Sequence, residues 1–296
     1  MPVNAERRSR CGLAIFFALI AISSAFLQFD TASLYSTAGS HLVTFYMWCV
    51  AASSIVARLI MRESPRDISF RWNGSATTRA LLIAFAFPLI AGITTYGIVW
   101  STGLASFAPE SLPLEIFRIS LSGSATMRFC KYLLVNLTIG ALWSCKSAAG
   151  EEIGWRGYML TRLMSARAPA PIVLSGLIWA LWHMPLIFSG QYASVPHSPS
   201  SIAIFVIDIT AMGCTLAWLR LYSGSIWPCI WAHGAWNAVI LGAFGGSTHG
   251  GDAWVGEAGL LTALIVIAIS VALYRLRPPL PEDAGVKKRA SAAEIQ

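Results

Sequence analysis

Long apolar stretches recur along the whole chain and are separated by short polar connections. A bilayer core of about 30 Å needs roughly 20 consecutive apolar residues for each helix that crosses it. By this measure the pattern predicts an all-α, polytopic transmembrane helical bundle with about eight spans. The approximate ranges are 11–28, 41–60, 80–101, 132–151, 171–189, 201–221, 225–244 and 257–274.

The amino-acid composition excludes a soluble protein. Hydrophobic residues make up 56% of the 296 residues and charged residues only 12%, whereas soluble domains carry roughly 25% charged residues. So little charge cannot cover a water-exposed surface, and an intrinsically disordered chain would carry more charge and less apolar surface. We therefore interpret residues 1–296 as a single integral-membrane domain, in which the polar residues 279–296 are expected to be a disordered cytoplasmic tail.

The formal net charge of +7 indicates topology rather than a nucleic-acid partner. Cytoplasmic loops of membrane proteins collect Lys and Arg. With the N-terminus in the cytoplasm, eight spans return the C-terminus to the same side and place 18 of the 21 basic residues there. Only Arg118, Arg128 and Lys131 fall on the outer side. The distribution predicts that both termini are cytoplasmic and that no nucleic acid is bound.

Ionisable side chains at membrane depth are costly, so each one is a candidate for function. Of the fourteen acidic residues, we expect only Glu151, Glu152 and Asp208 in or against the spans. Of the five histidines, we expect His183 and His233 to lie deep. We interpret Asp208 as a polar group in helix packing, or as a residue that orients a catalytic neighbour.

The two glutamates lie at the inner end of the fourth predicted span. The apolar stretch from Tyr132 to Cys145 has 14 residues, about 21 Å of helix, which is too short to cross alone. The helix must therefore run on and draw Glu151 and Glu152 to the membrane boundary. Glu152 and Arg156 are four residues apart and can form an ion pair on one helix face, whereas Glu151 points about 100° away and is left for chemistry. The alternative is a juxtamembrane ion pair with no catalytic task.

Two further helices are predicted to carry polar side chains inside the membrane. His183 lies one turn after Trp179 and two residues before Pro185, which should kink the helix. His233 and Asn237 are four residues apart and project to one side of the seventh span. The alternatives are a buried histidine bonded to a carbonyl group and hydrogen bonds that join helices. Together with the glutamates, these residues predict a polar cavity that opens to the cytoplasm.

Such a cavity can support peptide-bond hydrolysis in two ways. Glu151 can act as a general base on a water that His183 orients, while His233 and Asn237 donate hydrogen bonds to a developing oxyanion. Alternatively, Glu151, His183 and His233 can ligate Zn²⁺, which lowers the pKa of a bound water toward about 7. The sequence contains no His-Glu-x-x-His motif of zinc proteases, no Gly-x-Gly-Asp motif of aspartyl proteases and no rhomboid-like Gly-x-Ser-Gly motif.

Three motifs, in order on separate apolar segments, make the chain resemble a known family. The family is that of the CPBP proteins (CAAX protease and bacteriocin-processing, or Abi), the type II CAAX prenyl endopeptidases included. The resemblance covers 130–245, the core of the domain. The matching residues are Glu151, Glu152 and Arg156 for Glu-Glu-x-x-x-Arg, Trp179 and His183 for Phe-x-x-x-His, with Trp where Phe is usual, and His233 and Asn237 for His-x-x-x-Asn.

The resemblance implies an intramembrane endopeptidase that hydrolyses a membrane-associated or lipidated, CAAX-like peptide, with that peptide and membrane lipid as its partners. It implies that Glu151 and His183 activate the water, that Glu152 and Arg156 support them, and that His233 and Asn237 donate to the oxyanion. A bacterial inner membrane is the expected location. The family does not fix a cofactor, and Zn²⁺ held by Glu151, His183 and His233 remains an alternative.

Two other classes of function stay open at this stage. One is a non-catalytic membrane protein that gives immunity to a bacteriocin or serves as a scaffold. The other is a small proton-coupled transporter in which Glu151 and the histidines relay protons, although no repeated pair of broken helices accompanies them.

Overall fold

The computed structural model describes residues 2–28, 39–190, 192 and 194–276, and most of these residues are helical. Among them, five helical segments are long and apolar enough to cross a membrane, by length and composition. The predicted all-α polytopic bundle is therefore confirmed. The helices that contain these segments are α1 (Pro2–Gln28), α2 (Gly39–Met61), α3 (Ser75–Thr102), the run of α7 (Pro171–Trp182) and α8 (Met184–Phe188), and α9 (Pro199–Ser223).

Each of the eight predicted ranges overlaps helical residues. The range 225–244 falls on α10 (Trp227–Trp236) and the π-helical segment Asn237–Gly245, and the range 257–274 falls on the shorter apolar helix α11 (Leu260–Leu276). How many of the helices cross the bilayer, and on which side the termini lie, stay predictions. The predicted tail 279–296 lies outside the described residues.

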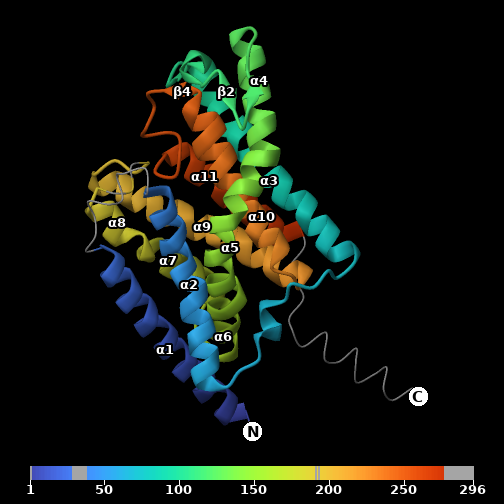
Figure 1. The fold of residues 1–296 in the computed structure, drawn as a ribbon, viewed down its shortest axis with the longest axis vertical. Helices are drawn as coiled ribbons and strands as arrows, with labels where there is room; N and C mark the ends of the chain where they lie inside the picture. The colour runs from blue at the N-terminus through green and yellow to red at the C-terminus, as the bar shows by residue number, and fades with distance from the viewer. Residues whose placement is uncertain (1, 29–38, 191, 193, 277–296) are drawn as a thin grey trace.

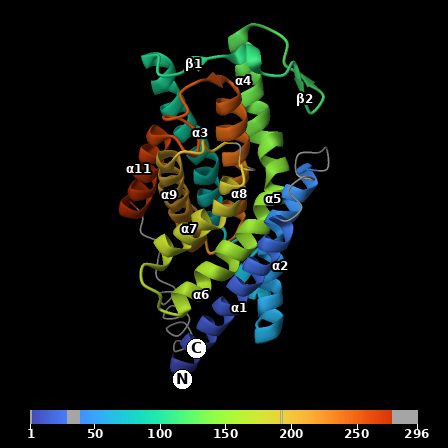
Figure 2. The same cartoon turned by 90° about the vertical axis from the view of Figure 1, so that its left-hand side faces the viewer.

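The glutamate-bearing helix is longer than the sequence pattern suggests. It begins with α4 (Ala125–Val135), passes through a π-helical turn (Asn136–Gly140) into α5 (Ala141–Gly154), and continues through a second π-helical turn (Trp155–Met159) into α6 (Leu160–Ser165). Figure 2 shows these elements as one continuous green run. The prediction that the helix runs on through the two glutamates is correct, and both lie in the last turn of α5.

The short strands gather at one end of the molecule, far from the N-terminus (Figure 1). Strand β1 (Ser106–Phe107) pairs with β4 (Thr248–His249), and β2 (Glu115–Ile116) forms a hairpin with β3 (Ile119–Ser120) after a 3-10 turn at Pro109–Ser111. Backbone with positive φ at Phe117 and Arg118 forms the turn of this hairpin.

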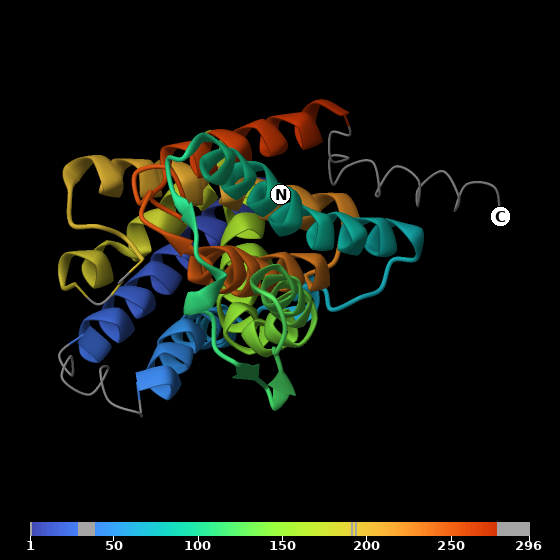
Figure 3. The ribbon, with the colours of Figure 1, turned by 90° about the horizontal axis from the view of Figure 1, so that it is seen from above.

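Helix α5 lies between α2 and α10 and contacts both (Figure 3). Small residues allow the close approach that tight helix pairs need. A Cβ atom on Gly234 of α10 would lie 2.9 Å from the main-chain oxygen of Ala141 in α5, and one on Gly176 of α7 would lie 2.5 Å from the main-chain oxygen of Thr210 in α9. Gly234 therefore allows α10, which carries His233, to lie against the glutamate helix, and Gly176 allows α7, which precedes His183, to lie against α9.

Candidate active site

The Glu-Glu-x-x-x-Arg segment is completely buried, with Glu151, Glu152 and Arg156 each 0% exposed. The expected ion pair is present: Arg156 Nη1 lies 2.8 Å from Glu152 Oε1. The same carboxylate oxygen lies 2.9 Å from Nδ1 of His233, which arrives from α10. Glu152 is thus held by a guanidinium from its own helix and by an imidazole from another.

Glu151 is held by different partners. Its Oε2 accepts hydrogen bonds from two indole groups, Trp179 Nε1 at 2.6 Å and Trp155 Nε1 at 3.3 Å. Its Oε1 is buried and makes no hydrogen bond with the described part of the chain. The prediction that Glu151 is left free therefore holds for one oxygen of the carboxylate, while the other oxygen is fixed by neutral donors.

His183 lies where α7 ends and is 5% exposed. Its Nδ1 lies 2.9 Å from the main-chain oxygen of Trp179. Because a carbonyl oxygen can only accept, we assign the ring proton to Nδ1, which leaves Nε2 as the basic nitrogen. This is the carbonyl-bonded histidine that the sequence offered as an alternative, and the bond also fixes the direction of Nε2.

Trp179 joins the separate parts of the cluster. Its ring centre lies 5.2 Å from that of His233 and 5.8 Å from that of His183, and the guanidinium carbon of Arg156 lies 4.4 Å from the ring centre. Its main-chain oxygen accepts a hydrogen bond from His183, and its indole N–H donates one to Glu151. The tryptophan that stands in the usual phenylalanine position is therefore more than an aromatic face, because phenylalanine has no N–H group to donate.

The structure brings five of the six predicted catalytic residues into this buried cluster. Asn237 follows Trp236 at the point where α10 becomes π-helical, and it is partly buried. No hydrogen bond of its side chain is found within the described residues, so its role as an oxyanion donor stays a prediction. Asp208 of α9 is 0% exposed, and neither carboxylate oxygen makes a hydrogen bond with a described residue.

A fourth buried carboxylate, Glu257, was missed by the sequence analysis, which expected only three at membrane depth. It is 3% exposed, and its oxygens accept from Tyr192 Oη at 2.7 Å and from Trp236 Nε1 at 3.2 Å. Burial is the main cause that raises the pKa of Tyr192 well above its usual range, and the negative charge of Glu257 raises it further. The phenol therefore keeps its proton and donates it in the hydrogen bond. The sequence contained one sign that Glu257 is buried, because it is the first residue of the predicted span 257–274.

The three suggested metal ligands do not form a metal site. Among the described residues, no three His, Cys, Asp or Glu side chains are arranged so that they could hold a metal ion. His233 uses Nδ1 on Glu152, His183 uses Nδ1 on a carbonyl, and Glu151 uses Oε2 on two indoles. Histidines that ligate a metal make the same kind of bond through their other ring nitrogen, so it is the arrangement of the three side chains, and not these contacts, that does not fit Zn²⁺ coordination.

Comparison with known proteins identifies relatives of this segment. Residues 130–239 match the family model described as type II CAAX prenyl endopeptidase, Rce1-like. The chain is also 38% identical over 79 residues to CAAX prenyl protease 2 of Methanococcus maripaludis. This similarity covers 25% of the chain and 29% of that relative, so the chain spans less than a third of the length of the relative it matches. The family match contains all six predicted catalytic residues.

Proposed function

We propose that the chain is an intramembrane endopeptidase, because residues 130–239 match the type II CAAX prenyl endopeptidase, Rce1-like family model. Its substrate is a membrane-associated or lipidated peptide of the CAAX kind. The observation that carries the proposal is the buried carboxylate of Glu151, which has one oxygen fixed by two indoles and the other oxygen unpartnered. An ionisable group at this depth is a default indicator of function.

The proposed reaction uses a single water. Oε1 of Glu151 takes a proton from the water as its oxygen attacks the scissile carbonyl carbon, while Nε2 of His183 accepts the second hydrogen bond of that water. The charge that develops on the carbonyl oxygen is stabilised by His233 and Asn237. The proton on Glu151 then passes to the peptide nitrogen, the carbon–nitrogen bond breaks, and a carboxylic acid and an amine are released.

Glu152 and Arg156 act on His233 rather than on the substrate. For Nε2 of His233 to donate to an oxyanion while Nδ1 faces Glu152, both ring nitrogens must carry protons. The carboxylate of Glu152 at 2.9 Å supports this charged ring, and Arg156 keeps the carboxylate in place. The distribution of basic residues supports a cavity that opens to the cytoplasm, and we propose a bacterial inner membrane as the host membrane.

The experiment that tests this proposal is cleavage of a fluorogenic, C-terminally farnesylated peptide by the purified full chain. Glu151→Gln should lower kcat by about 10²–10⁴-fold because the amide cannot accept the proton. Glu115→Gln, which changes an exposed glutamate of the β2–β3 hairpin, should leave kcat unchanged. A chelator should leave wild-type activity unchanged, because the site residues do not form a metal-binding group.

The outcomes separate the classes of function. Full cleavage by both Glu151→Gln and His183→Ala would refute the assigned mechanism. Absence of cleavage by the wild type with the farnesylated peptide, together with cleavage of an unlipidated membrane peptide, would refute the CAAX-like substrate and keep the protease. Protection against a bacteriocin that survives both substitutions would favour the immunity role.

A further inference from the structure

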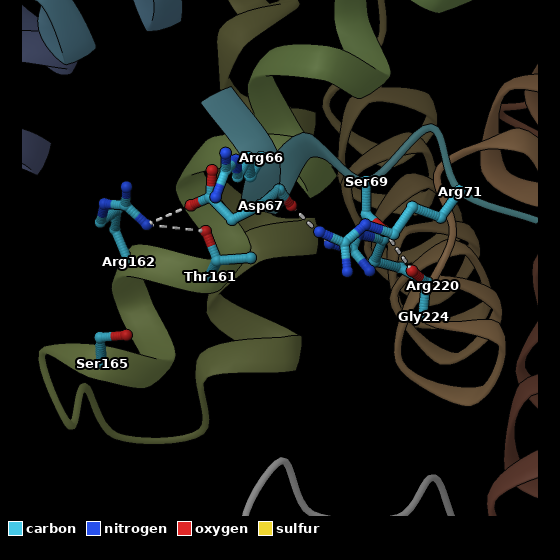
Figure 4. Close-up of a pocket in the computed structure, with 9 residues that line it drawn as sticks. All are labelled: Arg66, Asp67, Ser69, Arg71, Thr161, Arg162, Ser165, Arg220 and Gly224. Atoms are coloured by element: carbon cyan, nitrogen blue, oxygen red, sulfur yellow. Dashed lines mark hydrogen bonds and ion pairs between the residues drawn. The ribbon is translucent and has the colours of Figure 1, made fainter. Parts of the chain in front are cut away.

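A second polar site lies away from the glutamate cluster, at the end of the molecule where α2 is connected to α3. Here a cavity of about 420 Å³ opens between that connection, α6 and the turn that follows α9 (Figure 4). This volume lies in the range of small-molecule sites. Four arginines line it, Arg66 and Arg71 from the connection, Arg162 from α6 and Arg220 from α9.

The acidic side chains nearby do not neutralise this set of arginines. Among the described residues that line the cavity, Asp67 is the only acidic one. Its two carboxylate oxygens already pair with Arg58 and Arg162. Arg162 also pairs with Glu63 at 2.7 Å. The cavity therefore keeps an excess of positive charge, which comes chiefly from Arg66 and Arg71.

Arg66 and Arg71 are available to a ligand. Both are exposed, and neither takes part in an ion pair within the described part of the chain. Beside them, Arg220 is only 8% exposed and donates from Nη2 to the main-chain oxygen of Asp67 at 2.6 Å. This bond holds a buried positive charge against the wall of the cavity. A fixed guanidinium with two adaptable ones is an arrangement suited to phosphate, which arginine binds through paired N–H groups.

Exposed aromatic side chains next to the cavity are typical of a membrane surface. Phe70 and Trp72 flank Arg71 and are 48% and 60% exposed. Trp227, at the start of α10, is 43% exposed, lies 5.3 Å from Phe70 between ring centres, and donates from Nε1 to the main-chain oxygen of Phe70. Exposed tryptophans gather at the level of the lipid headgroups, where lipid phosphates also lie. The aromatic side chains therefore favour a headgroup-level position for the arginines.

We propose that this cavity binds the phosphate group of an anionic membrane lipid. Basic pockets between helices near the cytoplasmic surface are known to receive such headgroups on electrostatic grounds. The bound phosphate would bridge the α2–α3 connection, α6 and α9. It would thereby brace the far end of the helical run that carries Glu151 and Glu152. The site is independent of the proposed protease activity.

The test measures binding of phosphatidylglycerol to the detergent-purified full chain by native mass spectrometry, with phosphatidylcholine and inorganic phosphate as the comparison ligands. Arg71→Gln should weaken the apparent Kd for phosphatidylglycerol about fivefold, and the Arg66→Gln/Arg71→Gln pair about twenty-five-fold. The matched control is Arg79→Gln, which removes an exposed arginine of α3 outside the cavity and should change the Kd less than twofold. Thermal unfolding of each variant checks that it is folded.

Three results would overturn the proposal. Equal effects of Arg71→Gln and Arg79→Gln would show that binding follows total charge rather than this cavity. Equal affinity for phosphatidylcholine would show that the anionic headgroup is not recognised. Inorganic phosphate that binds with the same arginine dependence and displaces the lipid would show that the source of the phosphate is soluble.

Discussion

Replacing Trp179 by phenylalanine isolates one hydrogen bond of the proposed active site. The substitution removes the indole N–H that donates to Glu151 Oε2 at 2.6 Å and keeps an aromatic ring between the two histidines. It also installs the residue that is usual in the family. Cleavage should therefore survive at the optimal pH, while the carboxylate loses the shorter of its two donors.

The magnitude follows from the kind of bond that is lost. A hydrogen bond to a charged group contributes about 1.5–3 kcal/mol, and about 1.36 kcal/mol corresponds to a tenfold change in rate. The bond fixes the direction of the carboxylate, so its loss should lower kcat/KM by about 10–150-fold. Trp155→Phe, which removes the donor at 3.3 Å, should lower kcat/KM less.

The control is Trp182→Phe, which makes the same change in size and also borders His183, at 5.1 Å between ring centres. Its indole donates to Ser24 Oγ rather than to Glu151. Loss of packing alone would lower kcat/KM equally in both variants. An unchanged kcat/KM for Trp179→Phe, or an equal loss for Trp182→Phe, would refute the reasoning.

Three further changes test other parts of the structure. Gly234→Ala should destabilise the protein by about 1–3 kcal/mol, because its Cβ would lie within 3 Å of α5, whereas Gly97→Ala, with open space at its Cβ, should not lower the apparent Tm. Tyr192→Phe should cost about 1.5–3 kcal/mol, because it removes the hydroxyl that donates to the buried carboxylate of Glu257; an unchanged Tm in detergent would contradict this. A cysteine in place of exposed Ser165, in a cysteine-free background, should react with an impermeant maleimide only in opened cells, and labelling of intact cells would reverse the predicted topology.

The helical bundle and the ion pair could be predicted from the sequence because both depend on local spacing. Apolar stretches of about 20 residues indicate helices whatever their partners, and residues four apart share a helix face, as Glu152 and Arg156 do. The continuation of the glutamate helix followed from its length alone. These inferences need no knowledge of which helices are neighbours.

The contacts between helices could not be predicted in the same way. His233 and Glu152 are 81 residues apart in the sequence, and their pairing depends on how closely α10 approaches α5. Glu257 was missed because a carboxylate in a connection usually lies in water, whereas this one is enclosed by Tyr192 and Trp236. Hydropathy describes segments, and it does not show which connection folds back over the bundle.

The two adjacent glutamates are distinguished by the charge of their partners. Glu152 contacts Arg156 and His233, so its carboxylate holds the imidazole in place. Glu151 is held by two indole donors on Oε2, and its Oε1 makes no hydrogen bond within the described residues. A general base must gain a proton in the transition state. The geometry therefore supports Glu151 as the base and Glu152 as the residue that holds His233, on grounds separate from the order of the motif.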